Sequence, residues 1–197
     1  MLWCLILFNF IMFQGDLTPS PDKTLWYDII YKEKTIGSLK ATKTHKDAKT
    51  TYHTSSTIAF RLIKEFAVNY NYSVDFEAKL LKKAVVNIHI NDKSHAKTLT
   101  QWHENEYLIT KNGKSEVPIK TTIDYTTILL YFLEPTHINN CYSEQDGSFN
   151  TIVSLGNHVY KKINANGKEN VYYYKNGVLE KAVIDGGLIA FEMLLRK

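Results

Sequence analysis

The sequence FAVNYNYSVDF, residues 66–76, alternates apolar side chains with polar or small ones along its whole length. Side chains of a β-strand point alternately to opposite faces, so the pattern predicts one long strand with an apolar face and a polar face. We expect the apolar face to line the concave interior of a curved sheet, and its members are candidate ligand-lining residues. These residues are Phe66, Val68, Tyr70, Tyr72, Val74 and Phe76.

The chain from residue 24 onward consists of similar strand-like runs separated by turn residues. Asn-Gly pairs at residues 112–113 and 176–177 lie between such runs and predict hairpins, because both residue types tolerate positive φ. A spacing of roughly 8 to 12 residues per strand indicates an antiparallel meander. Curling such a meander removes its exposed edges. The predicted fold is therefore all-β, a strongly curved antiparallel meander that forms a barrel or half-barrel.

One segment departs from the strand pattern. TTIDYTTILLYFLEP, residues 121–135, places Ile123, Thr127, Leu130 and Leu133 near helical spacing, and Pro135 ends the run. We expect one short helix near residues 125–133, packed over one end of the sheet.

The first fifteen residues, MLWCLILFNFIMFQG, carry no charge and are almost all apolar. The apolar run is too short for a membrane-spanning helix and suits a signal peptide, although no lysine or arginine precedes it; a buried helix is the alternative. We therefore divide the chain into a signal peptide (1–15), a polar spacer (16–23) and a single β-barrel-like domain (24–197). Removal of the signal leaves Cys141 as the only cysteine, which excludes an intramolecular disulfide.

The charge pattern argues against nucleic acid as a partner. The net charge is +4, but only two of the 24 basic residues are arginine, Arg61 and Arg196, and the lysines are spread along the whole chain. Phosphate and base recognition favours the planar fork of arginine. Lysines at positions 40, 82 and 97 fall within predicted strands, where a lipid-facing lysine costs on the order of 2 to 4 kcal/mol. We therefore expect that the protein is not an integral membrane protein once its signal peptide is removed.

The histidines do not predict a metal site. A hairpin that turns at Asp92 and Lys93 puts His89 and His95 on opposite faces, and His103 lies about 26 Å along the strand from His95 at about 3.3 Å per residue. Zinc needs its nitrogen ligands within about 2.1 Å of one ion. The sequence predicts no metal and no cofactor.

No catalytic motif occurs. The nucleophile elbow, the phosphate-binding glycine loop and the His-Glu-x-x-His motif are all missing from the sequence. Candidate acids, among them Asp28, Asp75, Glu134 and Asp146, are isolated from one another along the chain. We therefore predict no catalytic residues and no enzyme, with a hydrolase assembled from distant residues as a remaining alternative.

Several blocks resemble a known family. They are YDIIYKEKTIGSLKATKT (27–44), LLYFLEP (129–135), YSEQDGSF (142–149) and YYYKNGVLEKAV (172–183). In this order they are similar to an uncharacterised family of small exported proteins of Gram-negative bacteria, a domain of unknown function. The resemblance implies an all-β, barrel-like protein of the periplasm or cell envelope, without an assigned active site.

Together these features predict a non-enzymatic periplasmic or envelope protein. Its partner would be a hydrophobic or lipid-like small molecule bound in the concave face of the sheet, or another envelope protein. The alternative is a structural or protein-interaction module with a filled core and no small-molecule ligand. The two differ in whether the interior of the curved sheet is hollow.

Overall fold

The computed structural model of the chain describes residues 22–61, 65–187 and 189–197. Within these residues the fold is a single fourteen-stranded antiparallel sheet with almost no helix. The predicted signal peptide and most of the predicted spacer lie outside the described residues. No helix in the described part of the chain is long and apolar enough to cross a membrane.

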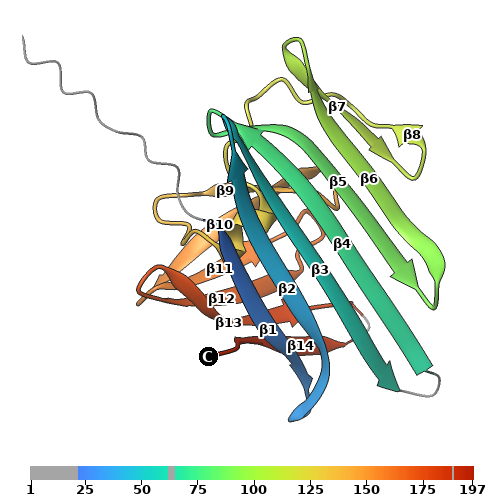
Figure 1. Cartoon of the computed structure of the whole chain (residues 1–197), viewed down its shortest axis with the longest axis vertical. Helices are drawn as coiled ribbons and strands as arrows, with labels where there is room; N and C mark the ends of the chain where they lie inside the picture. Colours follow the sequence, from blue (N-terminus) through green and yellow to red (C-terminus); the bar gives the residue numbers. More distant parts are fainter. Residues whose placement is uncertain (1–21, 62–64, 188) are drawn as a thin grey trace, which may run out of the picture.

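The chain forms two consecutive meanders. The first meander comprises β1 (Lys23–Tyr31), β2 (Lys34–Lys46), β3 (Lys49–Arg61), β4 (Glu65–Glu77), β5 (Leu80–Ile90), β6 (Lys93–His103), β7 (Glu106–Lys111) and β8 (Lys114–Ser115). The second comprises β9 (Asn140–Ser143), β10 (Ser148–Gly156), β11 (Val159–Ile163), β12 (Glu169–Lys175), β13 (Val178–Asp185) and β14 (Ala190–Leu195). Figure 1 shows the long strands of the first meander beside the shorter strands of the second.

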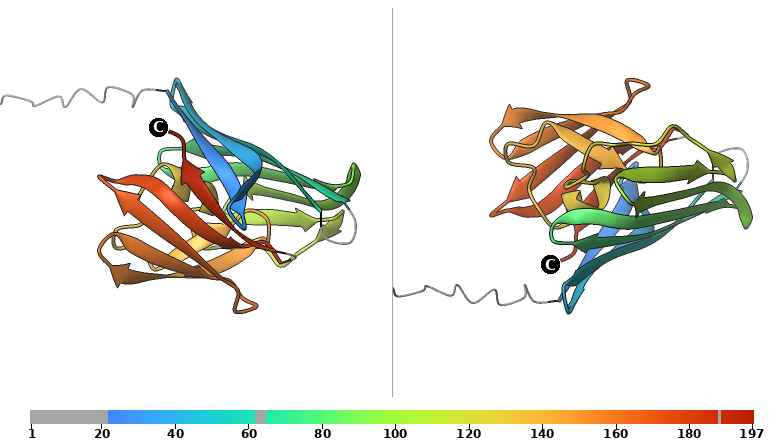
Figure 2. Two further views of the ribbon diagram at one scale, coloured as in Figure 1. Left: turned by 90° about the horizontal axis from the view of Figure 1, so that it is seen from below. Right: turned by 90° about the horizontal axis from the view of Figure 1, so that it is seen from above.

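The first and last strands join the two meanders. β1 pairs antiparallel with β14, with Tyr27 opposite Leu195 and Ile29 opposite Met193. The strand order therefore runs from β8 back to β1, then from β14 back to β9, and the sheet is not closed. Figure 2 shows the two meanders as curved halves that face each other. The predicted all-β curved meander is confirmed, in its open form.

The connection between β8 and β9 lies along both halves. Ile119 forms an isolated antiparallel bridge with Tyr107 of β7, and Thr126 forms a parallel bridge with Tyr142 of β9. The Leu81 amide also donates to the carbonyl of Ile123 at 2.8 Å. The connection thus links the two ends of the sheet that strand pairing leaves apart.

The predicted helix is present in shortened form. It is a 3-10 helix, η1 (Thr127–Tyr131), with Ile128, Leu129 and Leu130 buried. Bonds from the Leu129 amide to the Thr126 carbonyl and from the Phe132 amide to the Leu129 carbonyl give it the tighter three-residue repeat. It contacts β3, β9 and β13, so it lies between the two halves and not only over one end of the sheet.

Hairpin turns occur at residues that tolerate positive φ. Asn112 and Gly113 have φ of 50° and 80°, and Asn176 and Gly177 have φ of 51° and 74°, which confirms both Asn-Gly predictions.

The predicted turn at Asp92 and Lys93 is wrong by one residue. Asn91 and Asp92 take the positive φ values, 48° and 63°, and Ile90 pairs with Lys93. Asparagine and aspartate both tolerate the left-handed region, so the turn closes one residue earlier. A register shift between Ile88 and His89 follows in this hairpin.

Buried tyrosines connect distant parts of the fold. The hydroxyl of Tyr27 donates to the Leu179 carbonyl at 3.2 Å, and that of Tyr174 donates to the Leu130 carbonyl at 2.7 Å. Burial raises the pKa of eleven tyrosines above the ordinary value. They are Tyr27, Tyr52, Tyr70, Tyr72, Tyr107, Tyr125, Tyr131, Tyr142, Tyr160, Tyr172 and Tyr174.

Candidate ligand-binding site

A cavity of about 390 Å³ lies between the two halves of the sheet. Its walls come from β1 to β4, from η1, from the β9–β10 turn and from β11 to β14. The site is therefore assembled from both meanders and from the connection between them, which are far apart in the sequence.

Small side chains on β3 leave this space open. Thr54 and Ser56 point inward and are paired with Tyr72 and Tyr70 of β4. One pair further along the same strands, Tyr52 lies opposite Val74, and both are buried in the core. Thr54 and Ser56 are smaller than Tyr52, the preceding inward-facing residue of β3. They therefore leave a cavity at positions where larger side chains would pack the core.

The long predicted strand contributes two of its residues to the cavity wall. Tyr70 and Tyr72 line it, whereas Val68, Val74 and Phe76 are buried in the core outside the lining. Phe66 lies at the end of the strand and stacks on Phe60, with ring centroids 5.4 Å apart. A ligand role for these side chains stays a prediction.

One wall of the cavity is polar. Lys162 and Asn164 of the β11 region, and Asn170 of β12, point into it, and Asn166 and Lys168 of the intervening turn lie beside them. Lys162 is paired with Asn170 across the two strands, so both fall on the inner face. Sequence reasoning missed this wall because a polar residue in an alternating strand is normally assigned to the solvent face.

Another part of the lining is apolar. It is formed by Ile29 of β1, Leu39 of β2, Ile58 of β3, and Phe191 and Met193 of β14. The cavity thus combines an apolar wall with a polar wall, an arrangement typical of sites for small amphipathic molecules.

Hydrogen bonds hold the β9–β10 turn against the first meander. The Tyr72 hydroxyl donates to Gln145 Oε1 at 2.9 Å, and the Thr98 hydroxyl donates to the Gln145 carbonyl at 2.8 Å. Thr100 Oγ1 and the Tyr142 hydroxyl lie 2.7 Å apart deeper in the core. These contacts fix one side of the cavity across strands that are not paired.

The fully buried carboxylate of Glu144 positions η1 at the cavity. It accepts hydrogen bonds from the Thr127 amide at 3.2 Å, from the Ile128 amide at 3.0 Å and from the Thr127 hydroxyl. Amides in the first turn of a helix have no partner within the helix, so this carboxylate takes the role that a capping residue usually has. Thr127, Ile128 and Tyr131 of the same helix line the cavity.

The family of this chain is evident from comparison with known proteins. The model of a family described as a domain of unknown function, DUF6134, matches residues 27–196. The chain belongs to the DUF6134 family. This member of the family is also similar in fold to a solved protein, the beta-barrel-like protein of the domain of unknown function DUF1849 from Brucella abortus. The TM-score is 0.58 at 10% sequence identity, over 90% of this chain and 96% of that one. No curated protein matches the chain in sequence.

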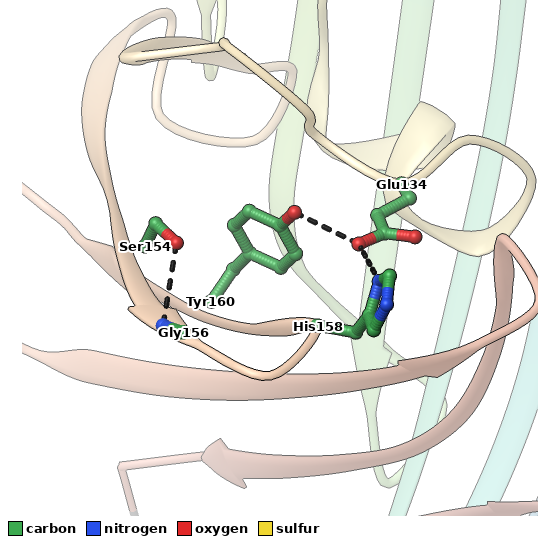
Figure 3. Close-up of polar contacts among 5 residues, drawn as sticks. All are labelled: Glu134, Ser154, Gly156, His158 and Tyr160. Carbon is green, nitrogen blue, oxygen red and sulfur yellow. Dashed lines mark hydrogen bonds and ion pairs between the residues drawn. The ribbon is translucent and has the colours of Figure 1, made fainter.

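A second polar cluster of this DUF6134 chain lies where the β10–β11 turn meets the connection between η1 and β9. Glu134 Oε1 accepts a hydrogen bond from the Tyr160 hydroxyl at 2.8 Å and lies 2.8 Å from His158 Nδ1 (Figure 3). The nearby Ser154 hydroxyl accepts a hydrogen bond from the Gly156 amide at 3.3 Å. In residues 22–61, 65–187 and 189–197, no serine hydroxyl is hydrogen-bonded to His158, which is the contact that activates a serine nucleophile.

Neither the histidines nor the cysteine of the DUF6134 domain form a metal site in the described part of the chain, where no three metal-binding side chains come together. His89, His95 and His103 are all exposed on the β5–β6 sheet. Cys141 is fully buried, and burial raises the pKa of its thiol well above the ordinary value. A thiol in this environment is a packing group and a poor nucleophile.

Proposed function

We propose that this DUF6134 protein is a non-enzymatic binding protein that holds a small amphipathic, lipid-like molecule between the two halves of its open barrel. The observation that carries the proposal is the cavity of about 390 Å³, which falls within the range of small-molecule sites. Its mixed lining favours a ligand with an apolar body and a polar end over a pure hydrocarbon.

The size of the cavity limits the ligand. The volume of about 390 Å³ lies near the lower end of the range of small-molecule sites, about 300–1,000 Å³. This matches one medium-length alkyl chain with a head group, and a two-chain lipid would leave most of its length outside. The proposed ligand is therefore a single-chain molecule.

We place this function in the periplasm or cell envelope. The support is the uncharged apolar run of residues 1–15, which suits an export signal. A filled scaffold that binds another protein is the alternative, and the space beside Thr54 and Ser56 favours the binding role.

Calorimetric titration with 1-decanol tests the proposal, because this neutral single-chain molecule matches the cavity in size. We expect one saturable site. The variant Ser56→Phe places a ring in the cavity and should lower the affinity at least about tenfold, at a stability cost of about 1–3 kcal/mol from overpacking. Ser55→Phe is the matched control, because Ser55 is the neighbour that falls on the opposite face of β3. Equal affinity of Ser56→Phe and wild type would refute the proposal.

A further inference from the structure

Two lysines lie on the polar wall of the cavity. Lys162 is half-buried on the inner face of β11, between Tyr160 and Asn164 in the alternation of that strand. Lys168 follows in the β11–β12 turn, and its ammonium reaches across to Gly187, where an added Cβ would lie 3.1 Å from Nζ. Both lysines therefore line the same polar wall, Lys162 half-buried and Lys168 exposed.

Neither lysine forms an ion pair within the described residues. The lysines that have a carboxylate oxygen within 4.0 Å there are Lys49, Lys161 and Lys181. Lys161 directly precedes Lys162, points to the other face of β11 and binds Glu169 at 3.0 Å. Within the described residues, β11 thus pairs its outward lysine with a carboxylate and leaves its inward lysine without one.

The cavity also contains two aspartates, which are hydrogen-bonded within their own turns. Asp146 accepts a hydrogen bond from the Ser143 hydroxyl at 2.9 Å, and Asp185 accepts one from the Gly187 amide at 2.8 Å. Neither carboxylate lies within 4.0 Å of the ammonium of Lys162 or Lys168 in the part of the chain that the structure describes.

Two asparagine side chains of the polar wall, those of Asn164 and Asn170, accept hydrogen bonds from backbone amides. Asn164 Oδ1 accepts hydrogen bonds from the amides of Asn166 and Lys168 at 2.9 and 3.0 Å. Asn170 Oδ1 accepts one from the amide of Asp185 at 2.9 Å. These side chains stabilise the β11–β12 turn, which carries Lys168, and the adjacent β13 end. Among the described residues that line the cavity, Lys162 and Lys168 are therefore the charged donors that remain for a ligand.

We propose that this cavity selects single-chain amphiphiles with an anionic head group, which Lys162 and Lys168 bind while the alkyl chain lies on the apolar wall of β1 to β3 and β14. The inference rests on the proposed function and specifies its ligand class. Carboxylate and phosphate heads share the required chemistry, since both accept charge-assisted hydrogen bonds from ammonium groups.

Calorimetric titrations with decanoate, decyl phosphate, 1-decanol and decylamine test the inference on the intact chain. The four probes share one alkyl chain and differ in head group. We expect at least one anionic probe to bind about tenfold or more tightly than 1-decanol, because a hydrogen bond to a charged group contributes about 1.5–3 kcal/mol. The preferred anion distinguishes a carboxylate head from a phosphate head.

The variants Lys162→Met and Lys168→Met keep a long apolar stem and remove the charge. Each should lose about tenfold in affinity for the preferred anion and much less for 1-decanol, which carries no charge, and an unchanged circular dichroism spectrum reports an intact fold. Lys161→Met is the matched control and should retain the anion preference.

The outcomes separate the two proposals. If 1-decanol and the anions all fail to bind wild type, both the proposed function and this inference are overturned. If 1-decanol binds but the anions bind no more tightly, or decylamine binds best, the inference alone is overturned. A loss of anion preference in Lys161→Met equal to that in Lys162→Met would overturn it as well.

Discussion

The buried carboxylate of Glu144 provides the sharpest test of how the fold holds the cavity open. In Glu144→Ala, the amides of Thr127 and Ile128 lose their acceptor in a buried environment. Each buried donor without a partner costs about 1–3 kcal/mol, so the two together should lower the free energy of unfolding by about 4 kcal/mol. Thr127 is only half-buried, so its hydroxyl can bond to water and adds little.

Urea unfolding followed by tryptophan fluorescence measures this change. Glu144→Gln keeps one acceptor oxygen and should lose about half as much, roughly 2 kcal/mol. Glu180→Ala, at an exposed position of β13, is the control and should change stability by less than about 0.5 kcal/mol. The capping role of Glu144 would be refuted if Glu144→Ala lost less than about 1 kcal/mol. Because η1 lines the cavity, Glu144→Ala should also weaken 1-decanol binding, which the same titration measures.

Three further predictions concern stability. Gly37→Ala would bring a Cβ within 2.1 Å of the Thr57 carbonyl oxygen, so by urea unfolding it should lose more than about 3 kcal/mol or fail to fold. In contrast, Gly113→Ala meets no atom within 4 Å and should lose only about 1–2 kcal/mol from its positive φ; equal losses at both glycines would contradict the steric reasoning. Tyr107→Phe removes a donor to the Leu81 carbonyl and an acceptor for the Ile123 amide, and should cost about 2 kcal/mol, whereas a change within about 0.5 kcal/mol would show that these bonds are dispensable. Finally, the eleven tyrosines with raised pKa values favour the neutral phenol in the folded state, so their stabilisation is complete below the ordinary tyrosine pKa of about 10 and declines as the pH rises above it. The absorbance at 295 nm that these eleven of the thirteen tyrosines contribute should therefore rise in one cooperative step that coincides with alkaline unfolding, and a gradual rise near pH 10 in the folded protein that accounts for most of the thirteen would contradict the burial.

Much of the fold follows from local patterns. The alternation in residues 66–76 and the Asn-Gly turns at 112–113 and 176–177 correctly predict a curved antiparallel meander, because side-chain period and turn chemistry are local properties. The 3-10 helix was also correctly located in sequence. Its length was overestimated because helical spacing of apolar residues does not distinguish a single turn, held from outside by Glu144, from a longer helix.

The cavity could not be predicted in the same way. The pattern rule assigns apolar side chains to the inside, so it selected Val68, Val74 and Phe76, which fill the core. The cavity instead depends on inward-facing polar residues, Ser56 and Lys162 among them, whose orientation is set by strand register across both meanders. Register depends on turn closure and on bulges, and a shift of one residue moves a side chain to the opposite face.

Local sequence patterns also do not predict the pairing of β1 with β14. It joins residues at the two ends of the domain, and it brings Ile29 and Met193 together in one cavity wall. Such long-range pairing is selected by the burial of both strands within the complete sheet. The composition of the site is therefore a property of the assembled fold.

The central claim is that the interior of this open barrel holds a ligand. Native mass spectrometry of the protein, purified without detergent from the cells that produce it, tests this claim most directly. The account predicts a one-to-one adduct with the mass of a single-chain anionic amphiphile, which is lost in Ser56→Phe and retained in Ser55→Phe. A mass equal to that of the polypeptide alone in the wild type, together with no uptake of added decanoate or 1-decanol, would contradict it.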